Sequence, residues 1–245
     1  MSTPTFFHAD LILGDTQASL VASEIAHARS SRRLKAGQKI KLLNGTGLLA
    51  ECQIEQIGRD LLTVSVQKIR EVAQTSHKLT LATAIPKGDR QRTMVDMLTQ
   101  LAVSEIIAVQ CDHSVTTVKD KQLQKWQRVA IEACKQSQNP WLPSIGQSLT
   151  VPALLECLQT QANTQAYYAD ATGDRVSAAL KSTVPNGNTT ILIGPEGGFS
   201  AAEVSLFDRA GLPCLRLAAH ILRTETAAIA AAAQFRDLYP AGISS

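Results

Sequence analysis

Hydrophobic and polar positions alternate in the first part of the chain. Residues 50–55 read AECQIE, in which every second residue is apolar, and residues 62–66 read LTVSV with the same period of two. The NGTG at residues 44–47, between KIKLL and the first of these segments, is a signal for a tight turn. Short alternating strands with frequent turns predict a small β-barrel over residues 1–72.

The period changes from about Lys78 onward. Short apolar runs that are typical of buried strands recur there, and they read LTLATAI, EIIAVQ, QAYYAD, TTILIG and CLRLA. Helical patterns separate most of them: Met94, Leu98 and Leu101 are spaced i, i+4, i+7, and Trp126 begins a similar stripe that we expect in the core. Alternating strands and helices predict a parallel α/β domain over residues 73–245, joined through a linker at 71–77.

Composition places the chain among globular proteins of a reducing compartment. Its 245 residues are 44% hydrophobic and 18% charged, and no apolar run approaches the roughly 18 residues of a membrane span. The N-terminal segment lacks the features of a signal peptide. The five scattered cysteines form no CxxC pair, which argues against disulfides and structural zinc. We therefore expect a cytoplasmic protein with no membrane association and no metal.

One segment is strongly basic, although the net charge is only +3. Residues 25–50 contain no acidic side chain but hold six basic ones: Arg29, Arg32, Arg33, Lys35, Lys39 and Lys41. Such a run is either a solvated face or a surface that contacts phosphates, since phosphate contacts supply most sequence-independent affinity for nucleic acid. No aromatic residue interleaves the run, so we do not expect base stacking here.

A glycine-rich loop follows one of the predicted buried strands, in the segment ILIGPEGGFS at residues 191–200. Ligands bind beyond the carboxyl ends of strands in open parallel sheets. Gly194, Gly197 and Gly198 can adopt positive φ and let a ligand approach the backbone closely. Ser200 and Glu203 have the spacing of a capping box that opens a helix. The loop is neither a P-loop nor a GxGxxG fingerprint.

A second unusual loop, AAHILRTETAA, occupies residues 218–228 and leads into an alanine-rich stretch at 227–233. It places Arg223, Thr224 and Glu225 at the start of a predicted helix. Arg223 and Glu225 have either a catalytic role or that of a structural ion pair. The small side chains of the helix predict close packing against another helix or a second subunit.

These two segments carry a family resemblance. IGPEGGFS, the acidic Glu203 and ILRTETA closely resemble the signature of the ribosomal small-subunit methyltransferase E family, and FFH, residues 27–33, IPKGDR and WQRVAIEACKQS resemble other parts of it. The resemblance covers essentially the whole chain. It implies a two-domain α+β protein, in which a PUA-like β-barrel precedes an α/β SPOUT domain with a C-terminal trefoil knot. It also implies a homodimer that methylates N3 of a uridine in 16S ribosomal RNA of the small subunit with S-adenosylmethionine.

The resemblance further implies roles for individual residues. The cofactor is expected to contact backbone groups of the two loops, at Leu192, Ile193, Gly194, Gly197, Gly198, Leu217, Ala218, Ile221, Leu222, Thr224 and Ala227. The expected catalytic residues are Arg223, which would stabilise charge on the uracil carbonyls, and Glu225. The acceptor of the N3 proton stays open among Glu196, Glu225 and His220. The expected RNA contacts are Arg29, Arg32, Arg33, Lys35, Lys87 and Arg90.

The chain departs from the family pattern at several of these places. It has Ala218 and His220 where the family usually has Gly and Arg, and its residues 100–103 read QLAV where the family has ELGV. An Arg expected after ACKQS is replaced within QNPW. Two alternatives therefore remain open: a divergent relative that methylates another RNA, and one that binds RNA without catalysis.

Overall fold

The computed structural model describes residues 3–21, 34–58, 61–117, 119–180 and 187–241. The chain divides into two compact units. The first contains the chain up to Gln74 together with Ile131–Leu142, and the second contains Thr75–Ala130 and Pro143–Ala241. The division follows the predicted change of pattern, except that the end of one helix and the segment after it belong to the first unit.

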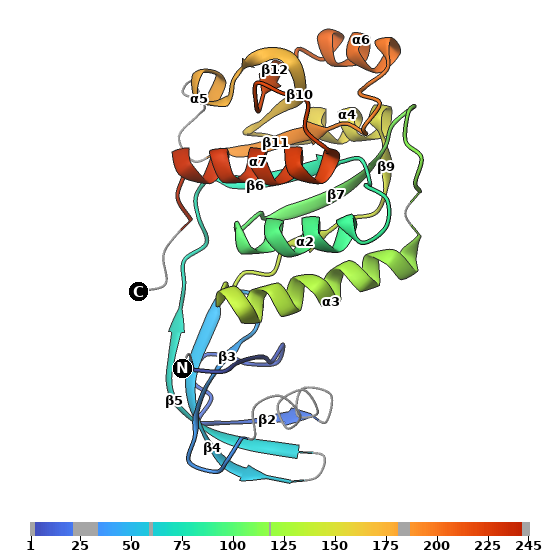
Figure 1. The fold of residues 1–245 in the computed structure, drawn as a ribbon. Coiled ribbons are helices and arrows are strands. Elements are labelled where there is room, and N and C mark those ends of the chain that lie inside the picture. Colours follow the sequence, from blue (N-terminus) through green and yellow to red (C-terminus); the bar gives the residue numbers. More distant parts are fainter. Residues whose placement is uncertain (1–2, 22–33, 59–60, 118, 181–186, 242–245) are drawn as a thin grey trace. The chain divides into compact units, whose positions relative to one another are not determined.

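The first unit is a five-stranded mixed sheet with the order β1-β3-β4-β5-β2 (Figure 1). Its strands are β1 (Thr5–Phe7), β2 (Gln17–Val21), β3 (Lys39–Leu43), β4 (Leu48–Ile57) and β5 (Leu61–Glu71). The predicted alternation in β4 is confirmed, since Ala50, Cys52 and Ile54 are buried and the polar residues between them are exposed. The tight turn before β4 is also present, with the Asn44 side chain accepting hydrogen bonds from the backbone N–H groups of Thr46 and Leu48.

The QNPW segment, residues 138–141, packs against the turn before β4 in this unit. Gly47 has a φ of +104°, and a Cβ there would lie 2.4 Å from Cζ2 of Trp141. The Trp141 indole also donates a hydrogen bond to the Val72 carbonyl at 3.1 Å. The segment that departs from the family pattern therefore makes a packed structural contact within the first unit, called the β unit below.

The second unit is built on a parallel sheet with the strand order β12-β10-β11-β6-β7-β8, and β9 also pairs with β7. The five predicted apolar runs are confirmed as strands of this sheet. The strands are β6 (Lys78–Thr83), β7 (Glu105–Gln110), β8 (Ser144–Ile145), β9 (Leu149–Thr150), β10 (Thr164–Arg175), β11 (Asn188–Ile193) and β12 (Cys214–Arg216). Every pairing among them is parallel, so their carboxyl ends lie at one edge of the sheet.

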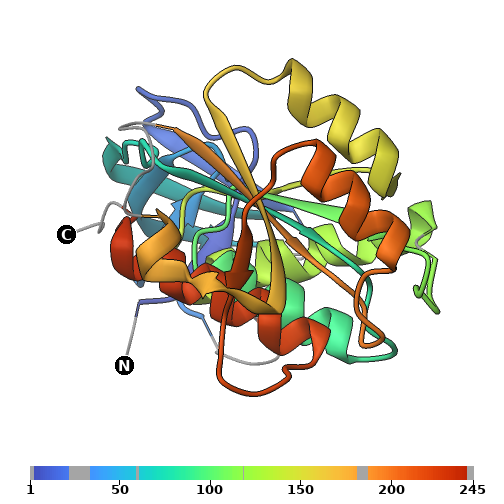
Figure 2. The same ribbon diagram turned by 90° about the horizontal axis from the view of Figure 1, so that it is seen from above.

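Helices cover both faces of this sheet (Figures 1 and 2). They are α2 (Arg90–Gln100), α3 (Asp120–Ser137), α4 (Val151–Thr160), α5 (Val176–Ala179), α6 (Ala201–Arg209) and α7 (Thr224–Leu238). On one face, α4 and α6 pack over Ala82, Val109 and Leu192. On the other, α2 and α7 pack against each other, and the buried Ala228, Ala231 and Ala232 of α7 confirm close helix packing within the chain. No described helix is long and apolar enough to cross a membrane.

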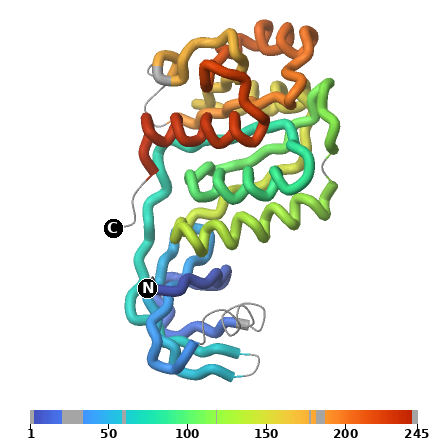
Figure 3. The backbone as a smooth tube through the Cα atoms, in the orientation of Figure 1, coloured from blue at the N-terminus to red at the C-terminus, as the bar shows by residue number. Residues whose placement is uncertain are grey.

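The chain between β11 and α7 can be followed in Figure 3, where it leaves the sheet, forms α6 and returns through β12. This order of elements is the one expected for the α/β domain. The trefoil knot implied by the resemblance stays a prediction.

The end of α2 explains one departure from the family pattern. Ala102 has a φ of +53°, and its N–H bonds the Thr99 carbonyl while that of Val103 bonds the Leu98 carbonyl. These two bonds form a Schellman motif, whose left-handed residue is usually glycine. The alanine retains the motif but adopts a backbone conformation that a Cβ disfavours by about 1–2 kcal/mol.

Ala102→Gly should therefore raise the free energy of unfolding. Glycine relieves the left-handed strain in the folded protein, which raises the free energy of unfolding, and it adds conformational entropy to the unfolded chain, which lowers it. Because the first contribution is the larger, we expect the free energy of unfolding to rise by about 0.5–1 kcal/mol. Ala210→Gly is the control, because Ala210 also ends a helix but has a φ of −82°. Urea denaturation measures both variants, and an unchanged or lower midpoint for Ala102→Gly would contradict the strain argument.

The cysteines give a second prediction. Burial raises the pKa of the thiols of Cys52, Cys111 and Cys134 to about 12, and it also raises the pKa of the partly buried Cys214 thiol. Since the thiolate is the nucleophile, these groups stay protonated and unreactive at pH 8, while the exposed Cys157 is accessible. Peptide mass spectrometry after brief alkylation of the native protein at pH 8 should find Cys157 modified first. Equal labelling of a buried cysteine would show that the assigned packing is wrong.

Candidate functional site

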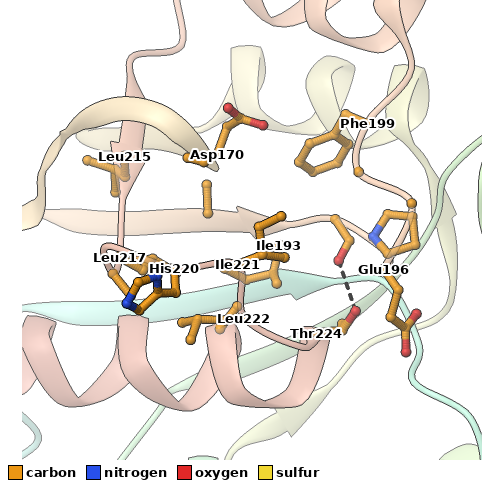
Figure 4. Close-up of a pocket in the computed structure, with 18 residues that line it drawn as sticks. Asp170, Ile193, Glu196, Phe199, Leu215, Leu217, His220, Ile221, Leu222 and Thr224 are labelled. Carbon is orange, nitrogen blue, oxygen red and sulfur yellow. Dashed lines mark hydrogen bonds between the residues drawn. The ribbon is translucent and has the colours of Figure 1, made fainter.

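A cavity of about 300 Å³ lies at the carboxyl end of β11. Its walls come from three segments, shown in Figure 4: the middle of β10, the end of β11 with the glycine-rich loop after it, and the segment from β12 through the following loop into the start of α7. Its size is at the lower end of the range for pockets that hold small ligands. The two loops singled out by sequence thus meet around a single space.

The glycine-rich loop is held at both ends. Gly198 donates its N–H to the Pro195 carbonyl at 2.9 Å, which closes a tight turn, and Phe199 packs edge-on against Phe207. The predicted capping box is confirmed, with reciprocal hydrogen bonds between Ser200 and Glu203 at the start of α6. The loop therefore passes directly from a buried strand into a capped helix.

Glycine meets a different structural requirement at each of the three loop positions, Gly194, Gly197 and Gly198. Of the three, only Gly198 uses the freedom to adopt positive φ, with a φ of +73°. A Cβ at Gly194 would lie 3.1 Å from the Phe199 ring, and one at Gly197 would lie 3.3 Å from Cβ of His113. A Cβ at Gly198 would meet nothing within 4 Å, so it would occupy open space beside the cavity.

The second loop is tied to the first. Thr224, the first residue of α7, donates its hydroxyl to the Gly194 carbonyl at 3.1 Å, the bond drawn dashed in Figure 4. The Leu217 carbonyl accepts a hydrogen bond from Gln234 of α7 at 3.0 Å. Between these points Ile221 is 90% exposed although it lines the cavity. The loop thus has fixed ends and a solvent-facing apolar side chain.

The structure gathers most of the expected cofactor residues. Ten of the eleven line the cavity: Ile193, Gly194, Gly197, Gly198, Leu217, Ala218, Ile221, Leu222, Thr224 and Ala227. Leu192 does not, since its side chain points into the core beneath α4 and α6. Sequence reasoning missed Asp170, Phe199 and Leu215, which also line the cavity. Asp170 could have been found, because a carboxylate directly follows the apolar run of β10.

The expected catalytic residues lie outside the cavity lining. Arg223 is exposed and is the N-cap of α7, without a capping hydrogen bond from its side chain. Glu225 is only 8% exposed, and its buried Oε2 atom has no hydrogen-bond partner. The described titratable side chains that line the cavity are Asp170, Glu196 and His220. Of the three candidate proton acceptors, Glu196 and His220 therefore face the cavity and Glu225 does not.

Tyr168, which adjoins Ala169 of the cavity lining, is a neutral aromatic side chain. Burial, reinforced by Cys214, raises the pKa of the Tyr168 hydroxyl to about 12, so this side chain stays neutral and packs as an aromatic against Phe207. Among the described residues, no group of three or more His, Cys, Asp or Glu side chains is arranged to hold a metal ion.

The expected RNA contacts are distributed over both units. Arg29, Arg32 and Arg33 lie outside the described residues. Lys35 is exposed ahead of β3, and Lys87 is exposed between β6 and α2. Arg90 is different, because its guanidinium lies 3.0 Å from a carboxylate oxygen of Glu196 and 3.5 Å from one of Glu225.

Comparisons with known proteins agree with this architecture. A model of the RNA methyltransferase domain matches residues 73–236, and a model of the RNA methyltransferase PUA domain matches residues 22–67. Ribosomal RNA small subunit methyltransferase E of Mycobacterium bovis is 30% identical over 92% of this chain and 88% of its own length. The chain belongs to the ribosomal RNA small subunit methyltransferase E family.

Other members extend the likeness to sequence and structure. The Bacillus subtilis enzyme of the same name is 29% identical, with 85% of each chain covered. The crystal structure of the Neisseria gonorrhoeae enzyme, bound to S-adenosyl methionine, has a TM-score of 0.87 at 22% identity and covers 97% of this chain and 98% of that one. A probable rRNA-methyltransferase from Porphyromonas gingivalis has a TM-score of 0.82 at 26% identity, covering 96% and 98%. The two-domain fold expected from the resemblance is therefore confirmed, apart from the knot, which stays a prediction.

Proposed function

We propose that this protein methylates N3 of a uridine in 16S ribosomal RNA of the small ribosomal subunit, with S-adenosylmethionine as the methyl donor. The observation that carries the proposal is the meeting of the two family loops around one cavity, joined by the bond from Thr224 to Gly194. Membership of the family and the name of its curated members support the substrate.

The residues of the cavity fit this cofactor. Leu215, Leu217 and Leu222 provide an apolar wall for a flat base, and Gly198 leaves room for close approach to the backbone. Two carboxylates, Asp170 and Glu196, face a space with no Lys or Arg in its described lining. Glu196 is itself paired with Arg90, which leaves Asp170 as the carboxylate without a basic partner in the lining. This lining suits the net charge of +1 of S-adenosylmethionine, whose sulfonium and ammonium are partly offset by its own carboxylate.

The chemistry requires the N3 proton to leave as the new N–CH3 bond forms. When bound, the cofactor would supply an electrophilic methyl group, with the S–CH3 bond breaking and its electron pair staying on sulfur as a neutral thioether. The protein must orient the uracil ring, exclude water and accept the proton, a role open to Glu196 and His220. Arg223 keeps its proposed role of stabilising charge on the uracil carbonyls, reaching the base from the exposed start of α7.

We further propose that the β unit contacts RNA phosphates through its basic segment, Lys35 included, and that the protein works as a cytoplasmic homodimer. The homodimer is the assembly that the family resemblance implies, and the exposed Ile221 lies beside the cavity where a second subunit would complete the site. The buried alanines of α7, Ala228, Ala231 and Ala232, do not indicate a subunit interface, because they pack within the chain.

Cofactor placement is tested by two matched glycine variants. Gly198 and Gly211 both have positive φ and open space where a Cβ would lie, but only Gly198 lines the cavity. Each substitution by alanine should cost about 1–2 kcal/mol of stability. In calorimetry at a temperature where both are folded, Gly198→Ala should bind S-adenosylmethionine at least about tenfold more weakly, or roughly 1.4 kcal/mol. Gly211→Ala should bind normally, and equal affinities would place the cofactor elsewhere.

Catalysis is tested by single-turnover methylation of small subunits from cells that lack the protein. Wild type should produce N3-methyluridine, and Arg223→Ala should be slower by about a hundredfold or more with both substrates saturating, as when a transition-state donor is lost. Arg209→Ala, which removes an exposed arginine of α6, should react normally. A near-normal rate for Arg223→Ala would make Arg223 a structural residue. Tight RNA binding without any methylation would support the non-catalytic alternative, and a product at another RNA would support the divergent-substrate alternative.

The oligomeric state is tested by sedimentation equilibrium. At micromolar concentration we expect a mass twice the 26.3 kDa of the chain. A single-chain mass throughout that concentration range would contradict the proposed dimer.

A further inference from the structure

Arg90 connects the two loops that frame the cavity. Its Nη1 lies 3.0 Å from Oε1 of Glu196, in the glycine-rich loop, and 3.5 Å from Oε2 of Glu225, in the first turn of α7. Its Nε also donates to the Lys87 carbonyl at 3.3 Å, which fixes the guanidinium against the turn before α2. One side chain therefore contacts both functional segments, which are 106 and 135 residues away in sequence.

The two carboxylates differ in how they are held. Glu225 is almost fully buried, and among the described residues Arg90 forms the ion pair with its Oε2, which has no hydrogen bond. A buried carboxylate is costly without a counter-charge, so this pair constrains the guanidinium strongly. The side chains of Glu196 and Arg90 are 39% and 34% exposed, and Glu196 lines the cavity. Glu225 is thus the fixed end of the network and Glu196 is the end that faces the ligand.

The glycine-rich loop needs such external support, because glycines restrict the backbone less than other residues do. Toward its end, His113 Nδ1 lies 3.1 Å from the Gly198 carbonyl oxygen, and the Ser200 hydroxyl donates to the Asp112 carboxylate. Arg90 restrains the earlier part of the loop through Glu196. The loop is held between the turn after β7 and the start of α2.

We propose that Arg90 is a positioning residue: through Glu225 and Glu196 it fixes the backbone of the glycine-rich loop for cofactor binding, and it does not contact RNA phosphates. This inference rests on the proposed function, in that the ligand of the loop is taken to be S-adenosylmethionine. It replaces the expectation from sequence that Arg90 binds RNA. A guanidinium already engaged by two carboxylates is a poor partner for a third anion.

The test is a double-mutant cycle with Arg90→Gln and Glu196→Gln, measured by calorimetry with S-adenosylmethionine. Arg92→Gln is the matched control, because it removes an exposed arginine from the same helix. We expect Arg90→Gln to weaken binding about tenfold, Glu196→Gln to weaken it by a similar factor, and the double variant to be little weaker than Arg90→Gln alone. Arg92→Gln should match wild type. Wild-type affinity in Arg90→Gln, or strictly additive losses, would overturn the proposal.

The salt dependence of RNA binding separates the two roles of Arg90. If Arg90 positions the loop, Arg90→Gln retains the wild-type slope; if it contacts a phosphate, the slope falls by about one unit. Should wild type and Arg92→Gln both fail to bind the cofactor, the proposed function is at fault. Amide hydrogen exchange then still tests the positioning role, because residues 194–198 should exchange faster in Arg90→Gln, and equal exchange would overturn it. If Arg90→Gln does not fold, the partly exposed Glu196→Gln carries the same exchange test.

Discussion

The site depends on one constraint: the glycine-rich loop at residues 194–199, which contains three glycines, must hold a fixed shape at the carboxyl end of β11. Glycine allows the backbone to turn at Gly198 and to pass close to Phe199 at Gly194, but it supplies no rigidity of its own. Rigidity comes from side chains of other elements, namely Thr224 from α7, His113 from the turn after β7, and Arg90 from α2. The parallel sheet makes this possible because it brings the carboxyl ends of its strands to one edge.

This arrangement also explains why the cavity lining combines carboxylates with apolar side chains. Asp170 lies in β10 just beyond the last residue that pairs with β11, Tyr168, and Glu196 lies in the loop after β11, so both carboxylates lie near the point where this pairing ends. Leu217 and Leu222 come from a loop whose two ends are bound to α7 and to the first loop, which keeps apolar groups facing inward. A ligand with a flat apolar part and a positively charged part matches such a lining.

Much of the fold could be predicted from sequence because the signals were local. Strands buried on both faces are continuous apolar runs, and the capping box of Ser200 and Glu203 depends on a spacing of three residues. The loop residues of the cavity were also local, since the motifs are contiguous. Leu192 does not line the cavity, because alternate residues of a strand face opposite sides and a motif does not show which side is open; its expected backbone contact with the cofactor stays a prediction.

The rest required the three-dimensional arrangement. The pairing of Arg90 with Glu196 and Glu225 spans more than a hundred residues, and a basic residue in the IPKGDR turn is indistinguishable in sequence from one that binds phosphate. Positive φ at Ala102 was equally hidden, because alanine is not the residue that a Schellman motif favours. Hydrogen exchange with and without S-adenosylmethionine tests the central claim most directly. Residues 194–198 and 217–224 should both gain protection while β3 to β5 stay unchanged, and protection confined to any other segment would contradict a cofactor site built from these two loops.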